Sequence, residues 1–201
     1  MANYQKIVLA SSNHGKIKEL ATLLEPLNIE VILQSQFDIP DADETGLTFI
    51  ENAIIKARHA AKISGLPALA DDSGLAVDAL NGAPGIYSAR YAGKQCVAKD
   101  NIAKLIAEMQ HVPDEKRQAH FHCVLALVTT AYDPAPIICD GSWHGMILRE
   151  PRGSDGFGYD PIFYVPTENK SAAELTPARK NQISHRGMAL QTLVNKLAGQ
   201  S

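Results

Sequence analysis

The sequence is poor in the features that mark secreted, zinc-binding or membrane proteins. Its three cysteines, Cys96, Cys123 and Cys139, form no CxxC pair, which argues against a disulfide framework or a zinc site and favours reduced thiols. The apolar run Ile7 to Ala10 is too short for a signal peptide. No apolar stretch approaches the roughly 18 residues that a membrane span needs. We therefore expect a cytoplasmic protein that does not bind a membrane.

The sequence also lacks an excess of positive charge. Lysine and arginine number 19 against 22 aspartates and glutamates, which gives a formal net charge of -3. A nucleic-acid polymer is bound mainly through a basic surface, so this balance argues against such a partner but allows a single nucleotide. No repeat or low-complexity linker divides the chain. With 45% hydrophobic and 20% charged residues, the sequence suits one globular domain over residues 1–201.

Several familiar catalytic and metal motifs are missing. There is no G-x-S-x-G elbow of a serine hydrolase. His120 and His122 fall on one face of an expected strand, but no third ligand stands at a useful spacing, so we interpret them as ordinary strand residues. The segment 10–16 is not a P-loop, because Ala10 replaces the first glycine and Ile17 replaces the Ser or Thr after the lysine.

The hydrophobic pattern predicts strands and helices that share one core. The expected strands are 6–10, 29–33 and a long antiparallel pair at 119–130 and 136–148, and the expected helices are 15–24, 48–64, 98–109 and 185–198. We expect Pro26 to end the first helix and Ser184 to cap the last. The predicted buried face of the second helix is Ile50, Ala53, Ile54, Ala57 and Ala61. These elements indicate an α/β fold.

Two adjacent carboxylates, Asp71 and Asp72, end an apolar run that includes Leu69. Ser73 and Gly74 follow, and we expect them to form a turn into a second apolar run. Side chains alternate along an extended segment, so the two carboxylates are predicted to point to opposite faces. Carboxylates beside apolar walls suit a hard divalent cation or a general base. The alternative is a polar turn without chemistry.

Two of the expected helices begin with positive charge. His14, Lys16 and Lys18 open the first, and His185 and Arg186 open the last. The positive end of the helix dipole disfavours cations unless an anion binds there, held by exposed amides and basic side chains. The first of these segments follows a strand, where α/β folds bind ligands, and so predicts a phosphate site. The alternative for Lys16 is a solvated surface lysine.

A glycine-rich segment, 153–161, places three glycines around two aromatic residues and two carboxylates. Glycine lets the backbone approach a ligand closely, and Phe157 or Tyr159 could stack on a base. Taken alone, the segment favours a plainer interpretation, a glycine-rich hairpin whose aromatic side chains pack on the core.

Together these segments resemble the inosine triphosphate pyrophosphatase family, which removes deaminated purine nucleoside triphosphates from the nucleotide pool. The matching segments, in the family's order, are 10–16, 44–46, 49–53, 70–75, 85–91, 156–161 and 184–187. One departure is Ser11-Ser12-Asn13, where the family often has Thr-Gly-Asn. The resemblance implies a long mixed β-sheet flanked by helices, with two lobes around a central active-site cleft, and a homodimer.

The resemblance also implies the reaction, hydrolysis between the α and β phosphates to a monophosphate and pyrophosphate, with Mg²⁺ as cofactor. It assigns substrate binding at the phosphates to Ser11, Ser12, Asn13, His14, Gly15, Lys16 and Lys56. Metal binding falls to Glu44 and Asp72, with Asp72 also the expected base and Asp71 the second candidate for that role. The base pocket comprises Phe157, Gly158, Tyr159, Asp160, Lys180, His185 and Arg186, with Ser73 nearby.

Substrate choice has a physical explanation in this interpretation. Hypoxanthine and xanthine carry an oxygen at position 6 that can accept from Arg186 and His185, whereas adenine presents a donor there. Guanine shares this oxygen, so its rejection must rest on another part of the base. One alternative is a related family that usually has Ser-Pro-Arg-Arg where this chain has residues 13–16. The other is a nucleotide sensor without chemistry, against which the cluster of acids argues.

Overall fold

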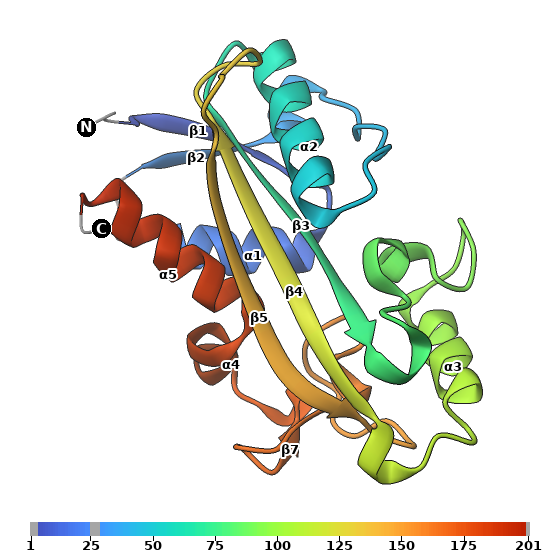
Figure 1. The fold of residues 1–201 in the computed structure, drawn as a ribbon. Coiled ribbons are helices and arrows are strands. Elements are labelled where there is room, and N and C mark those ends of the chain that lie inside the picture. Colours follow the sequence, from blue (N-terminus) through green and yellow to red (C-terminus); the bar gives the residue numbers. More distant parts are fainter. Residues whose placement is uncertain (1–3, 25–28, 200–201) are drawn as a thin grey trace. The chain divides into compact units, whose positions relative to one another are not determined.

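The computed structural model describes residues 4–24 and 29–199, which form a seven-stranded mixed sheet flanked by helices (Figure 1). The strands are β1 (Lys6–Ala10), β2 (Glu30–Leu33), β3 (Ala68–Val77), β4 (Gln118–Val128), β5 (Ile137–Ile147), β6 (Phe163–Val165) and β7 (Lys170–Ser171). Their order in the sheet is β2-β1-β3-β4-β5-β6-β7. β1 is parallel to both of its neighbours, whereas β6 is antiparallel to both of its own. The predicted α/β class and mixed sheet are confirmed.

All four expected helices are present, together with one that the sequence pattern does not predict. The helices are α1 (His14–Leu24), α2 (Phe49–Ser64), α3 (Ala98–Glu108), α4 (Pro177–Ile183) and α5 (His185–Leu197). The seven residues of α4 are too few to show a helical period. Ser184 precedes α5 as expected and also ends α4, and Pro26 lies outside the described residues. No helix in the described part of the chain is long and apolar enough to cross a membrane.

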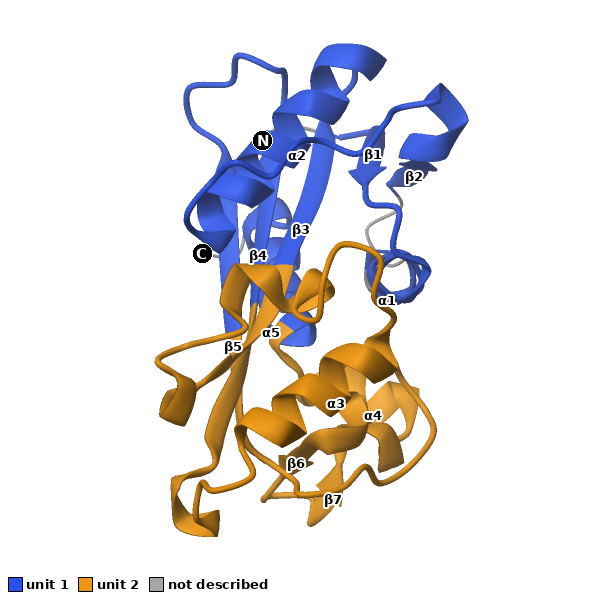
Figure 2. Ribbon diagram, turned by 90° about the vertical axis from the view of Figure 1, so that its right-hand side faces the viewer, with its two compact units in different colours: residues 1–72, 123–141, 186–201 blue, residues 73–122, 142–185 orange. Residues whose placement is uncertain are grey.

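The chain divides into two compact units (Figure 2). Unit 1 comprises residues 1–72, 123–141 and 186–201, and unit 2 comprises residues 73–122 and 142–185. Neither unit is a continuous segment, because β3, β4 and β5 each contribute residues to both. The single domain over residues 1–201 therefore stays a prediction.

Within unit 1, two separate hydrophobic clusters cover the two faces of the sheet. One cluster joins α1 and α5 to the strands and contains Leu20, Leu24, Leu190 and Leu193 with Ile7, Leu9 and Leu69. The other joins α2 to the strands and contains Ala53, Ala57 and Ala60 with Val8, Ala68 and Ala70. Neighbouring residues of a strand thus belong to different clusters, as the period of two requires. The same alternation sets the directions of Asp71 and Asp72, which follow Leu69 and Ala70 on β3.

Two local predictions are wrong. β3 runs through Ser73 and Gly74 without a turn, because neighbouring strands pair with it and basic side chains neutralise both of its carboxylates. Ile50, expected in the core, is 47% exposed, whereas Asn52 is fully buried. The buried face of α2 is therefore rotated from the expected one, and it includes the amide side chain of Asn52.

Candidate active site

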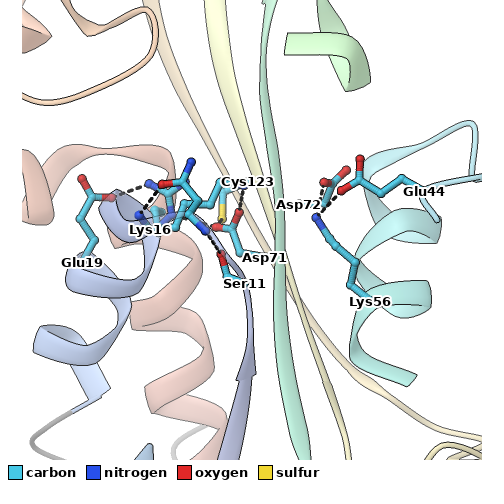
Figure 3. A network of polar contacts seen from close by, with 10 residues as sticks. Ser11, Lys16, Glu19, Glu44, Lys56, Asp71, Asp72 and Cys123 are labelled. Carbon is cyan, nitrogen blue, oxygen red and sulfur yellow. Dashed lines mark hydrogen bonds and ion pairs between the residues drawn. The ribbon is translucent and has the colours of Figure 1, made fainter. Parts of the chain in front are cut away.

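β3 carries Asp71 and Asp72 to opposite faces of the sheet, as the sequence predicts (Figure 3). Asp71 continues the face of Leu69 toward α1, and Asp72 continues the face of Ala70 toward α2. The two residues are only 1% and 6% exposed. Buried carboxylates require partners, and each one has basic side chains of its own.

On the α2 side, Lys56 links Asp72 to Glu44. Its Nζ donates to Oδ1 of Asp72 at 2.6 Å and to Oε1 of Glu44 at 2.9 Å. Burial raises the pKa of Asp72 above its ordinary value, although Lys56 works against that rise. Burial opposes the charge of Lys56, but Asp72 and Glu44 outweigh it and raise the pKa of this lysine. The result is one ammonium shared by two carboxylates.

On the opposite face, Asp71 is the centre of a second network. Lys16 donates to its Oδ1, Nε of Arg186 donates to its Oδ2 at 2.8 Å, and the Cys123 thiol lies 3.2 Å from the same oxygen. Arg186 also pairs with Glu19 (Figure 3 labels Glu19, Lys16 and Cys123). Burial favours the neutral acid, but the two cations outweigh it and hold the pKa of Asp71 well below its usual range.

The expected phosphate segment, 11–16, comprises the connection from β1 to α1 and the first residues of α1. Oγ of Ser11 accepts from the backbone N–H of Asn13, and Oδ1 of Asn13 accepts from that of Lys16. Ser12 donates to Asp41 at 3.0 Å. The side chain of Lys16 is 15% exposed and paired with Asp71, so the alternative of a solvated surface lysine is wrong. The segment therefore combines helix N-terminal amides with a lysine in a fixed position.

The carboxylates of Glu44 and Asp72 suit Mg²⁺ in chemistry and number. Magnesium prefers hard oxygen ligands and is usually held by one or two carboxylates together with substrate phosphates and water. Within residues 4–24 and 29–199, no group of three or more His, Cys, Asp or Glu could hold a metal alone. Lys56 already places a positive charge between the two acids. Glu44 and Asp72 thus fit a Mg²⁺ ion whose remaining ligands come from a bound polyphosphate and water.

In unit 2, a buried ion pair organises the glycine-rich segment. Nζ of Lys180 donates to Oδ2 of Asp160 at 2.7 Å and lies 4.7 Å from the centre of the Phe157 ring. The same oxygen accepts from the backbone N–H of Phe157 at 2.8 Å. A Cβ at Gly156, where φ is +78°, would lie 2.2 Å from that oxygen, so glycine is required. The structure thus brings Phe157, Asp160 and Lys180 together.

Two other residues of the expected base pocket, Tyr159 and His185, contact different parts of unit 2. Tyr159 is buried and donates to the carbonyl of Ser88 at 2.9 Å, and burial raises its pKa. His185 is buried, and its ring stacks on Phe121 with centroids 4.8 Å apart. The segment that carries Tyr159 connects the antiparallel strands β5 and β6, and the Tyr159 ring packs in the core as the plainer interpretation expects, whereas Phe157 is only partly buried.

Three contacts between polar side chains are missed by the sequence analysis. Glu19 pairs with Arg186, and its only sequence signal is its place three residues after Lys16 on α1. Cys123 is buried, and its contact with Asp71 has no signal in the sequence. His144 of β5 lies 5.4 Å from His120, ring centre to ring centre, and only strand pairing could reveal it.

The comparison with known proteins agrees with this geometry. Residues 7–196 match the model of the Ham1 family. The chain belongs to the Ham1 family. It is 61% identical over 196 residues to the dITP/XTP pyrophosphatase of Vibrio cholerae, with 98% of each chain covered. It is 58% identical over 193 residues to that of Escherichia coli, covering 96% of this chain and 98% of the relative.

Solved structures of Ham1 proteins share the fold. A HAM1 protein from Coxiella burnetii superimposes with a TM-score of 0.90 at 57% identity, covering 96% of this chain and 98% of its own. A dITP/XTP pyrophosphatase from Mycobacterium abscessus gives a TM-score of 0.74 at 45% identity, covering 94% and 98%. The resemblance to the inosine triphosphate pyrophosphatase family, drawn from the sequence, is therefore confirmed.

Proposed function

We propose that this Ham1 protein is a dITP/XTP pyrophosphatase. It hydrolyses ITP, dITP and XTP to the nucleoside monophosphate and pyrophosphate and so cleanses the nucleotide pool. The observation that carries the proposal is the arrangement of Glu44, Lys56 and Asp72, in which two carboxylates share one ammonium group. A binding protein for an anion would gain nothing from these acids, whereas a phosphoanhydride hydrolase needs a metal ligand and a base.

The triphosphate lies, in this proposal, at the segment 11–16 and along Lys56. The α1 N-terminus supplies backbone amides, and Lys16 and Lys56 supply positive charge. Ser11, Ser12, Asn13, His14 and Gly15 shape this anion site. Attack by water on a highly anionic triphosphate is slow until its charge is neutralised, so these groups act on the rate as well as on binding.

Glu44 and Asp72 are the residues that would hold Mg²⁺. When bound, the ion neutralises phosphate charge and polarises the phosphoryl group. Asp72 is also the base that takes a proton from the attacking water, and its raised pKa brings it nearer to the pH at which a base works best. Asp71 is the weaker candidate for that role, because Lys16 and Arg186 hold its pKa low.

The purine base binds, in this proposal, to Phe157, Gly158, Tyr159, Asp160, Lys180, His185 and Arg186, with Ser73 nearby. The ring of Phe157, fixed beside the Asp160–Lys180 pair, supports the base by stacking. Donors that face the oxygen at position 6 would face the amino group of adenine instead, which leaves polar groups unpaired and rejects ATP.

The homodimer in the proposal follows from the family resemblance, and the cytoplasmic location and the single domain follow from the composition of the sequence. We expect a homodimer that acts in the cytoplasm, where the nucleotide pool lies, with one domain over residues 1–201.

Pyrophosphate release tests the proposal directly. With Mg²⁺ present, the protein should release pyrophosphate from ITP, dITP and XTP much faster than from ATP or GTP. Release of orthophosphate instead would show cleavage at the γ phosphate and contradict the proposed bond. Binding of ITP without any product would support the alternative of a nucleotide sensor.

A further inference from the structure

We propose that Asn52 is a positioning residue that holds Glu44 ready for the metal and the triphosphate. The proposal rests on the proposed function, because it takes Glu44 as a metal ligand. Asn52 is fully buried on α2, and its Oδ1 accepts a hydrogen bond from the backbone N–H of Gly46 at 2.9 Å. Gly46 is two residues from Glu44, so this bond fixes the segment that carries the carboxylate.

The segment approaches the start of α2 very closely. A Cβ at Gly46 would lie 2.5 Å from Cβ of Glu51 and 2.7 Å from Oδ1 of Asn52, so only glycine fits there. The next two backbone N–H groups, of Leu47 and Thr48, donate to Oε2 of Glu51 at 2.8 and 2.9 Å. Three consecutive backbone amides are thus held by α2, and Asn52 holds the one nearest the metal ligand.

Asn52 also lies one helical turn before Lys56. Residues four apart share a face of a helix, so the same face of α2 presents the amide to the segment and the ammonium to Glu44. Nζ of Lys56 lies 2.9 Å from Glu44 and 2.6 Å from Asp72. The bond from Asn52 therefore sets the position of Glu44 relative to both Lys56 and Asp72.

The other end of the Asn52 amide is unsatisfied. Among the residues that the structure describes, its buried Nδ2 has no hydrogen-bond partner. The orientation of the amide is fixed, because Oδ1 must face the N–H of Gly46. A buried donor without an acceptor is costly and rare in native proteins. In the proposal, this donor gains an acceptor when metal and triphosphate bind, while Oδ1 keeps its bond to Gly46.

Asn101 is a matched control. Like Asn52, it is the fourth residue of its helix and buried, and it accepts from a backbone N–H of the preceding loop, that of Ala92, at 2.7 Å. Unlike Asn52, it has a satisfied Nδ2, which donates to the carbonyl of Ala89 at 3.2 Å. It lies in unit 2, whereas Glu44 and Asp72 lie in unit 1.

The first experiment compares Asn52→Leu with Asn101→Leu, each of which leaves one backbone N–H unpaired. Thermal unfolding is followed during a Mg²⁺ titration in the presence of a non-hydrolysable α,β-methylene analogue of ITP. Both variants should unfold at a lower temperature without ligand. Only Asn52→Leu should need more Mg²⁺ for half-maximal stabilisation, by about fivefold or more, the value of one hydrogen bond. Equal Mg²⁺ midpoints in the two variants would overturn the proposal.

The second experiment uses the unaltered chain and so does not depend on a variant that folds. The side-chain amide signals of Asn52 and Asn101 are followed by ¹⁵N NMR as Mg²⁺ and the same analogue are added. The Asn52 protons should move downfield and exchange more slowly, while those of Asn101 stay unchanged. If the analogue binds and the Asn52 side-chain signal does not change, the inference about Asn52 is overturned but the proposed function is not. A chain that neither binds the analogue nor releases pyrophosphate would overturn the proposed function as well.

Discussion

Nζ of Lys56 lies 2.6 Å from Oδ1 of Asp72, so the expected base of the reaction is neutralised by a lysine of α2 in the resting protein. Despite this partner, burial keeps the pKa of Asp72 raised. Lys56 has a second carboxylate partner, Glu44, at 2.9 Å. The lysine therefore remains paired when Asp72 accepts a proton or binds a metal. The ion pair with Lys56 thus stabilises the buried carboxylate of Asp72, and Asp72 can still leave the pair to act as a base.

Asp72→Asn should abolish turnover and leave the fold intact. The change removes a hard metal ligand and the base together, while Glu44 still pairs with Lys56. The measurement is kcat for pyrophosphate release from ITP, with unfolding temperature as the control for folding. A fall in kcat of less than about tenfold, or ~1.4 kcal/mol of barrier, would rule out the proposed role.

Lys16→Ala should raise KM for ITP and also lower the stability of the ligand-free protein. Lys16 neutralises the fully buried Asp71, so its loss should reduce the free energy of unfolding by about 1–3 kcal/mol. The helix dipole alone would suggest a neutral effect, and the ion pair reverses that expectation. The exposed Lys18 on the same helix provides the control variant Lys18→Ala. Lower stability with an unchanged KM would make Lys16 a purely structural residue.

Asp160→Asn should be strongly destabilising, by about 3–5 kcal/mol, because it leaves the buried ammonium of Lys180 without its counter-charge. It should also weaken ITP binding, since Asp160 fixes the backbone of Phe157. Chemical unfolding measures the first effect and KM the second. Glu168→Gln breaks the exposed pair with Arg179 and should change little, so similar losses in both variants would contradict the argument.

Arg186→Ala should reduce the preference for ITP over ATP by about ten- to a hundredfold, since the good substrate loses a charge-assisted hydrogen bond. Because Arg186 also pairs with Asp71 and Glu19, the variant should unfold at a lower temperature too. The ratio of kcat/KM for the two substrates separates the effects. An equal loss on ITP and ATP would assign Arg186 to the phosphates or to structure.

Asp133 should make stability depend on pH in the acid range. Backbone N–H groups of Thr129 and Ala135 donate to its carboxylate at 2.8 and 2.9 Å and lower its pKa. A lowered folded-state pKa contributes stability above the unfolded value of about 3.9, and this is lost as pH falls through the folded pKa. Wild type should therefore exceed Asp133→Asn in urea-unfolding stability at pH 7. A difference that does not shrink toward pH 3 would contradict this account.

The sequence by itself determined most of the elements and the family. Local hydrophobic period, helix caps and the order of short motifs are written in neighbouring residues, so α1, α2, α3 and α5 and the long strands β4 and β5 match their predicted ranges closely. The opposite directions of Asp71 and Asp72 also follow from a local rule, the alternation of side chains along a strand.

Tertiary structure alone decided how the charges are paired. Whether Asp71-Asp72-Ser73-Gly74 continues a strand or turns depends on partners such as Lys56, Lys16 and Arg186, which lie far away in sequence. The burial of Asn52 rather than Ile50 depends on how α2 rotates against the sheet, because the 3.6-residue period allows neighbouring faces. A local pattern fixes which elements form, whereas burial and ion pairing are properties of residues brought together only by folding.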